Sequence, residues 1–86
     1  MNIEDLRKNI DEIDEEIISL LEKRYKIVKS IGNYKKIHNI DIYDHKREKE
    51  IYLKIENKNI ENKKEILKIF EEIIKISKEI QWNILL

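Results

Sequence analysis

The feature that most constrains this chain is a regular row of apolar residues along its first third. The row advances in steps of three and four residues, at Ile3, Leu6, Ile10, Ile13, Ile17, Leu20, Ile27, Ile31 and Tyr34. This spacing is typical of a helix that packs along its whole length against another helix. We therefore predict one continuous helix from Ile3 to Ile37, about 50 Å long at a rise of about 1.5 Å per residue.

A helix of this length is longer than the remainder of an 86-residue chain can cover. A chain of this size forms one small domain with a marginal hydrophobic core, so a second subunit would help it to bury apolar surface. We predict a single all-helical domain over residues 1–86 that pairs with a second copy in an intertwined homodimer. The alternative is an extended monomer.

Two shorter helices are predicted after the long one. Asn39–Tyr43 is expected to be a short extended connector, and Asp44 is well placed to cap a helix over residues 44–57. The apolar positions of that helix form one narrow stripe of Ile51, Tyr52 and Ile55. With no proline, one glycine and 42% charged residues, the composition suits an all-α fold with solvated outer faces.

The asparagine-rich segment 57–62 interrupts the pattern before a third helix of medium length. Asn62 and Glu65 have the spacing of a capping box at its start. The helix continues to the end of the chain and presents one face of Ile66, Phe70, Ile73, Ser77, Ile80 and Ile84.

Composition excludes several functional classes. The chain has no cysteine, and its two histidines are too few for a convincing metal cluster, so no metal site is expected. The 18 basic and 18 acidic residues are interleaved, which argues against a nucleic-acid or anionic-membrane partner. Since neither a signal segment nor a membrane-spanning run is evident, we expect a cytoplasmic protein.

One position on the long helix does not fit its apolar face. Arg24 stands where a hydrophobic residue is expected, and burying its charge without a partner would cost several kcal/mol. It must reach an anion, such as Asp14, Glu16 or an acid across a dimer, or open onto a wet cavity. Lys35 projects within about 20° of Arg24, about 16 Å further along the axis, so the two cations can converge on one small ligand.

Arg7 lies on the flank of the same helical face, about 25 Å from Arg24. It cannot share a compact site with Arg24 of its own chain. In an antiparallel dimer it can enter the site of the other chain, and the simpler alternative is that its side chain only extends to solvent.

Polar residues also mark the other two predicted helices. Ser77 and Gln81 interrupt the apolar face of the third helix one turn apart, and the second helix opens with Asp44, Arg47 and Glu48. Taken singly, these have simpler explanations as a cap, a solvated helix start or a small residue at a helix crossing. However, the chain has only three arginines against 15 lysines, and arginine is favoured where a planar bidentate donor clamps a carboxylate.

Four elements in this order carry a resemblance to a known family: LRKNIDEIDEEIISLLEKR, GNYK, DHKRE and SKEIQ. They resemble the all-helical chorismate mutases of the shikimate pathway over nearly the whole chain. The resemblance implies that Arg24 grips a substrate carboxylate and that Arg7 of the other subunit is its counterpart. It implies further that Lys35 reaches a carboxylate and the ether oxygen, to which Gln81 donates a second hydrogen bond.

The same resemblance places Asp44, Arg47 and Glu48 around the substrate ring and its hydroxyl group, and Ser77 near a carboxylate. The implied reaction is the intramolecular [3,3] rearrangement of chorismate to prephenate, which requires no cofactor. Two alternatives stay open: a lyase of the same fold that eliminates pyruvate from isochorismate, and a non-catalytic helical dimerisation or regulatory module.

Overall fold

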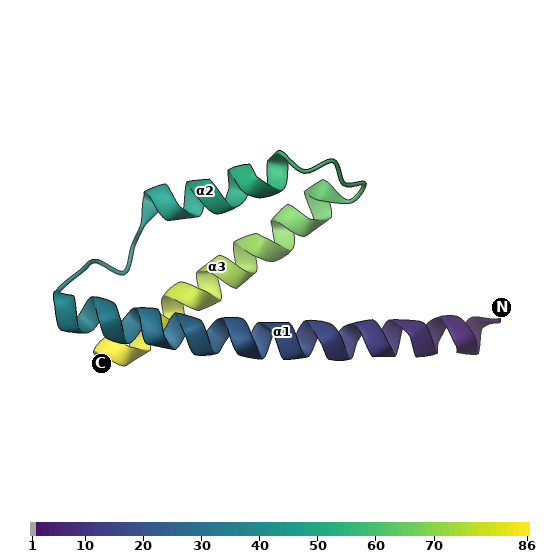
Figure 1. Ribbon diagram of the computed structural model, residues 1–86, viewed down its shortest axis with the longest axis horizontal. Coiled ribbons are helices and arrows are strands. Elements are labelled where there is room, and N and C mark those ends of the chain that lie inside the picture. Colours follow the sequence, from purple (N-terminus) through teal and green to yellow (C-terminus); the bar gives the residue numbers. More distant parts are fainter. Residues whose placement is uncertain (1) are drawn as a thin grey trace.

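Three helices make up the computed structural model, which describes residues 2–86. They are α1 (Ile3–His38), α2 (His45–Glu56) and α3 (Lys63–Leu85), and the described residues contain no strand. The predicted all-α class and the long, short and medium helices are therefore confirmed. α3 packs obliquely across the C-terminal half of α1 and against α2, while the N-terminal half of α1 extends beyond both (Figure 1).

Both ends of α1 are closed by asparagine. The Asn2 side chain accepts a hydrogen bond of 2.9 Å from the backbone N–H of Asp5. At the other end Asn39 adopts the left-handed conformation, with φ of 58°, and the backbone N–H of Ile40 donates to the Lys35 carbonyl at 2.8 Å. Asparagine tolerates this conformation better than most residues, so α1 stops here and the chain turns toward α2.

The predicted cap of α2 is present. The Asp44 carboxylate accepts a hydrogen bond of 3.0 Å from the backbone N–H of Arg47 and so satisfies a free donor of the first turn. The predicted cap of α3 is wrong. Asn62 occupies the N-cap position, but its side chain makes no capping hydrogen bond, because its ψ of 43° lies outside the extended region typical of a side-chain cap.

The core is small and lies along α3, which packs against the C-terminal half of α1 and against α2. Its buried apolar residues are Val28, Ile42, Ile55 and Ile74. The predicted face of α3 named Ile73 but not Ile74, whereas the most buried positions of α3 are Ile74, Ser77 and Gln81. The inward face of α3 therefore shares Ser77 with the predicted one but is turned toward Ile74 and Gln81.

The apolar seam in the N-terminal half of α1 remains uncovered in a single chain. Its side chains between Ile3 and Leu20 are 46–63% exposed. A contiguous apolar strip of this kind is typical of a protein–protein contact. None of the helices described is long and apolar enough to cross a membrane.

Gly32 allows α1 and α3 to approach closely. A Cβ atom at this position would lie 2.8 Å from the terminal Cδ1 of Ile84 and 3.3 Å from Cγ of Gln81. We expect Gly32→Val to lower the free energy of unfolding by roughly 1–3 kcal/mol, because two further methyl groups would force the helices apart. Urea unfolding of this variant, beside Asn33→Val at an exposed neighbour as control, measures the effect. An unfolding free energy equal to that of the control would show that the close approach is unimportant.

Candidate functional site

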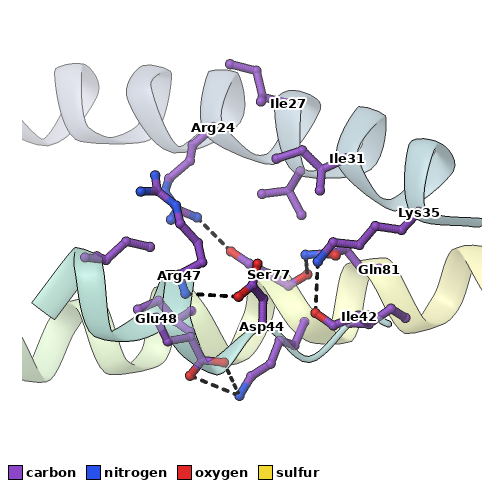
Figure 2. Close-up of a pocket in the computed structure, with 14 residues that line it drawn as sticks. Arg24, Ile27, Ile31, Lys35, Ile42, Asp44, Arg47, Glu48, Ser77 and Gln81 are labelled. Carbon is purple, nitrogen blue, oxygen red and sulfur yellow. Dashed lines mark hydrogen bonds and ion pairs between the residues drawn. The ribbon is translucent and has the colours of Figure 1, made fainter. Parts of the chain in front are cut away.

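A pocket of about 480 Å³ lies between the C-terminal half of α1, the connector, the start of α2 and the C-terminal half of α3 (Figure 2). Its apolar wall consists of Ile27, Val28, Ile31, Ile42, Ile51 and Ile74. The remaining lining residues are polar or charged. An apolar cavity with a few converging polar groups is the usual form of a small-molecule site.

Seven of the eight site residues predicted from the sequence line this pocket. They are Arg24, Lys35, Asp44, Arg47, Glu48, Ser77 and Gln81. The eighth, Arg7, lies on the exposed N-terminal half of α1, where its Nη1 is 3.3 Å from Oε1 of Glu4. The fold therefore brings together residues more than 50 positions apart in sequence, and leaves Arg7 outside the pocket of its own chain.

Arg24 reaches from α1 across the pocket to α3. Its Nη1 donates a hydrogen bond of 2.7 Å to Oγ of Ser77 (Figure 2). This hydroxyl in turn donates to the Ile73 carbonyl at 2.6 Å. Within residues 2–86 of one chain no carboxylate forms an ion pair with Arg24, and the alternative of a pair with an acid across a dimer stays a prediction. The guanidinium is held in place by a neutral hydroxyl and keeps its charge available.

Lys35 lies at the opposite end of the pocket from Arg24 (Figure 2). Its Nζ donates a hydrogen bond of 2.9 Å to the carbonyl oxygen of Ile42 in the connector. An ammonium group has three donors, and this contact uses one of them. The side chain therefore both anchors the connector and keeps donors for a ligand.

Gln81 is the most buried amide of the pocket, with 7% of its surface exposed. Its Nε2 donates to the Ser77 carbonyl at 3.3 Å, while its Oε1 is buried without a hydrogen-bond partner among the described residues. Buried polar atoms are nearly always hydrogen-bonded, so an unused one in a pocket favours a ligand contact. Gln81 therefore offers the pocket an unused hydrogen-bonding atom without adding charge.

The first turn of α2 forms the polar wall opposite α1. Asp44 lines the pocket and caps the helix at the same time, so the two predicted explanations for it are compatible. Arg47 also lines the pocket, and its Nη1 lies 3.4 Å from Oε2 of Glu50 in an exposed contact of small energetic value. Glu48 faces a residue that the sequence analysis did not single out, Lys78 of α3, whose Nζ lies 3.3 Å from Oε2 of Glu48.

The charges of the lining residues do not cancel. Four cations, Arg24, Lys35, Arg47 and Lys78, face two carboxylates, Asp44 and Glu48, which leaves a net charge of +2 on a chain whose total charge is zero. Such a local excess of positive charge favours an anionic ligand. No group of His, Cys, Asp or Glu side chains suited to a metal ion occurs within the described part of the chain.

Tyr52 lies in α2 and is affected by the charges of Glu48 and Lys78. Burial raises the pKa of its phenol, the negative charges of Glu48 and Glu71 raise it further, and Lys78 acts in the opposite direction. Tyr52 therefore remains a neutral phenol at physiological pH.

Four lining residues were missed for different reasons. Val28 is buried on α1 and directly follows Ile27, beside the predicted seam and not within it. Ile42 lies in a segment expected to be a plain connector, yet it is buried and its carbonyl holds Lys35. Ile74 was missed because the predicted face of α3 was rotated by one position. Lys78 had a usable signal, because it follows Ser77 directly and lies three residues before Gln81, on the flank of the same helical face.

Residues 6–82 match the family described as chorismate mutase type II. Over 81 residues the chain is 36% identical to a chorismate mutase from Methanocaldococcus jannaschii, which covers 90% of this chain and 81% of that protein. It is 49% identical over 53 residues to a bifunctional chorismate mutase/prephenate dehydratase from Aquifex aeolicus, which covers 62% of this chain. This chain spans only 15% of the length of that bifunctional relative.

A solved structure has the same arrangement of helices. The form II chorismate mutase from Thermus thermophilus superposes with a TM-score of 0.87 at 33% sequence identity, and the match covers 92% of each chain. The three-helix arrangement is therefore shared at nearly full length with a protein of that name.

Proposed function

Because this chain belongs to the chorismate mutase type II family, we propose that it rearranges chorismate to prephenate in the pocket between its three helices. The observation that carries this proposal is the convergence of seven predicted polar residues on one cavity, whose complete lining has a net charge of +2. Chorismate is a dianion with two carboxylates, an ether oxygen and a ring hydroxyl. The lining offers cations for the carboxylates and a carboxylate-rich wall for the hydroxyl.

In this proposal the protein supplies geometry and charge, and the substrate supplies the bonds that break and form. The cations hold the flexible dianion in the compact conformer that can react, which removes an entropic part of the barrier. Arg24 is suited to this role because Ser77 already fixes its direction at 2.7 Å. Asp44, Arg47 and Glu48 would then orient the ring end.

Catalysis proper would fall to Lys35 and Gln81. As the ether bond breaks, negative charge develops on its oxygen, and donors already in place stabilise it with little reorganisation. Lys35 has spare donors at the end of the pocket nearest to the connector. The Gln81 amide lies one turn from Ser77 on α3. Its Nε2 carries two N–H donors, and only one of them is given to the Ser77 carbonyl, which leaves the other for the ether oxygen.

We propose further that the active form is a homodimer. The exposed seam between Ile3 and Leu20 needs a covering surface, and a second copy of α1 offers the matching pattern. In an antiparallel pair, Arg7 of one chain would reach the pocket of the other. A cytoplasmic location remains a prediction from the sequence.

The test is to incubate the purified protein with chorismate and to identify the products by chromatography. We expect prephenate, whereas Arg24→Ala purified in parallel should give none and so exclude a contaminating enzyme. If chorismate is unchanged, the protein is next incubated with isochorismate. Release of pyruvate would then show that the protein is the lyase and not the mutase. A folded protein inert toward both, and unable to bind a cyclic dicarboxylate, would favour the non-catalytic module.

A further inference from the structure

An ion pair between α2 and α3 lies in the wall of the pocket. Nζ of Lys78 is 3.3 Å from Oε2 and 3.5 Å from Oε1 of Glu48, so the ammonium faces both oxygens of the carboxylate (Figure 2). The two side chains are only 31% and 20% exposed. The other two ion pairs of the described chain, Arg7–Glu4 and Arg47–Glu50, each join neighbours on one exposed helix. The Lys78–Glu48 pair is thus the one that joins two different elements.

Lys78 has a second contact, on the connector. Its Nζ lies 5.2 Å from the centre of the Tyr43 ring, within the range of a cation–π interaction. The Tyr43 hydroxyl is in turn 2.8 Å from Nδ1 of His45 at the start of α2. The ammonium of Lys78, from α3, therefore contacts both the connector and α2, which restricts the positions that it can adopt.

Glu48 depends on this ammonium. Its Oε2 is buried and has no hydrogen-bond partner in the described chain, so Lys78 is its only close counter-charge there. A partly buried carboxylate without a partner would turn toward water. With Lys78 in place, the Glu48 carboxylate is kept at the edge of the cavity.

We propose that Lys78 is a positioning residue, which holds the Glu48 carboxylate in the orientation that accepts a hydrogen bond from a ligand hydroxyl. This inference rests on the proposed function for the identity of the ligand. The competing explanation is that Lys78, itself a lining residue, binds a substrate carboxylate directly. The two differ in one respect: positioning requires Glu48, and direct binding does not.

A double-mutant cycle separates these explanations. Lys78→Met keeps a long side chain and removes the charge, Glu48→Gln removes the carboxylate, and Lys75→Met at an exposed position of α3 is the matched control. We expect Lys78→Met and Glu48→Gln each to raise KM for chorismate about tenfold, the effect of losing one charge-assisted hydrogen bond. The value of kcat should change much less, because the ring hydroxyl is remote from the breaking bond.

The decisive measurement is the double variant. If Lys78 acts through Glu48, adding Lys78→Met to Glu48→Gln raises KM no further, and Lys78→Arg restores most of the lost affinity. A further tenfold rise in the double variant would overturn positioning in favour of direct binding. Unchanged kinetics of Lys78→Met, relative to Lys75→Met, would also overturn it.

A second readout does not depend on turnover. The ¹⁵N-ammonium NMR signal of Lys78 in the ligand-free protein should shift in Glu48→Gln and stay unchanged in Glu50→Gln. A protein that is inert toward chorismate would remove the proposed function, and this signal would then still show whether Lys78 holds the Glu48 carboxylate. No shift in Glu48→Gln would overturn it.

Discussion

Replacing Lys35 with alanine is expected to lower kcat for chorismate by about two to three orders of magnitude, the typical cost of removing one donor from a developing negative charge. The reason is local, because Lys35 lines the pocket and its Nζ keeps donors beyond the one given to the Ile42 carbonyl. The fold should persist, since the lost contact involves a single hydrogen bond at the end of α1. The far-ultraviolet circular dichroism of the variant should match that of the unmodified protein.

Lys36 provides a matched control for this variant. It is the next residue of α1, and its Nζ also donates to a backbone carbonyl, that of Ile84 at 3.2 Å, but it does not line the pocket. Lys36→Ala therefore removes the same kind of side chain and the same kind of contact away from the cavity. We expect its kcat to stay within about twofold of the unmodified protein. An equal loss of kcat in both variants would show that the loss comes from a disturbed end of α1 and not from a missing donor in the pocket.

A second large effect is expected from mixing two inactive variants. In the proposed dimer each site combines Arg24 of one chain with Arg7 of the other, so Arg7→Ala and Arg24→Ala should each abolish turnover. A heterodimer of the two variants has one site with both arginines and one site with neither. With random exchange, half of the dimers are heterodimers, so the mixture should regain about a quarter of the unmodified activity.

The structure of one chain supplies the basis for this expectation. Part of α1 extends beyond α2 and α3 (Figure 1). Arg7 is exposed on this part and, among residues 2–86, is paired only with Glu4. Mixing Lys35→Ala with Arg24→Ala is the control, because both residues line the pocket of the same chain and no intact site can form. Absence of rescue in the first mixture, with subunit exchange confirmed by mass spectrometry, would contradict the shared site.

Most of the helical architecture could be predicted because it depends on local pattern. The spacing of the seam predicted the ends of α1 to within one residue. Asp44 was predicted to cap the start of α2, and its capping hydrogen bond is present. The grouping of Arg24 and Lys35 followed from helical periodicity alone. Each of these features is determined by residues that are close together in the sequence, so each can be predicted from the sequence alone.

The remaining features depend on tertiary packing. The rotation of α3 that buries Ile74 is set by its contacts with α1 and α2, and Asn62 fails as a side-chain cap because the preceding loop dictates its backbone angles. The position of Lys78 beside Ser77 can be read from the sequence, but only the approach of α2 gives it Glu48 as a partner. The roles of the site residues in turnover stay predictions until the variants are measured.

The continuity of α1 determines where this chain can change length. Arg24 and Lys35 lie on one unbroken helix, so inserting or deleting a single residue between them would turn one side chain by about 100° relative to the other and remove it from the cavity. Segment 57–62 lies between two helices and carries no lining residue, so its length is free to vary. Natural or engineered variation in chain length should therefore concentrate in that loop.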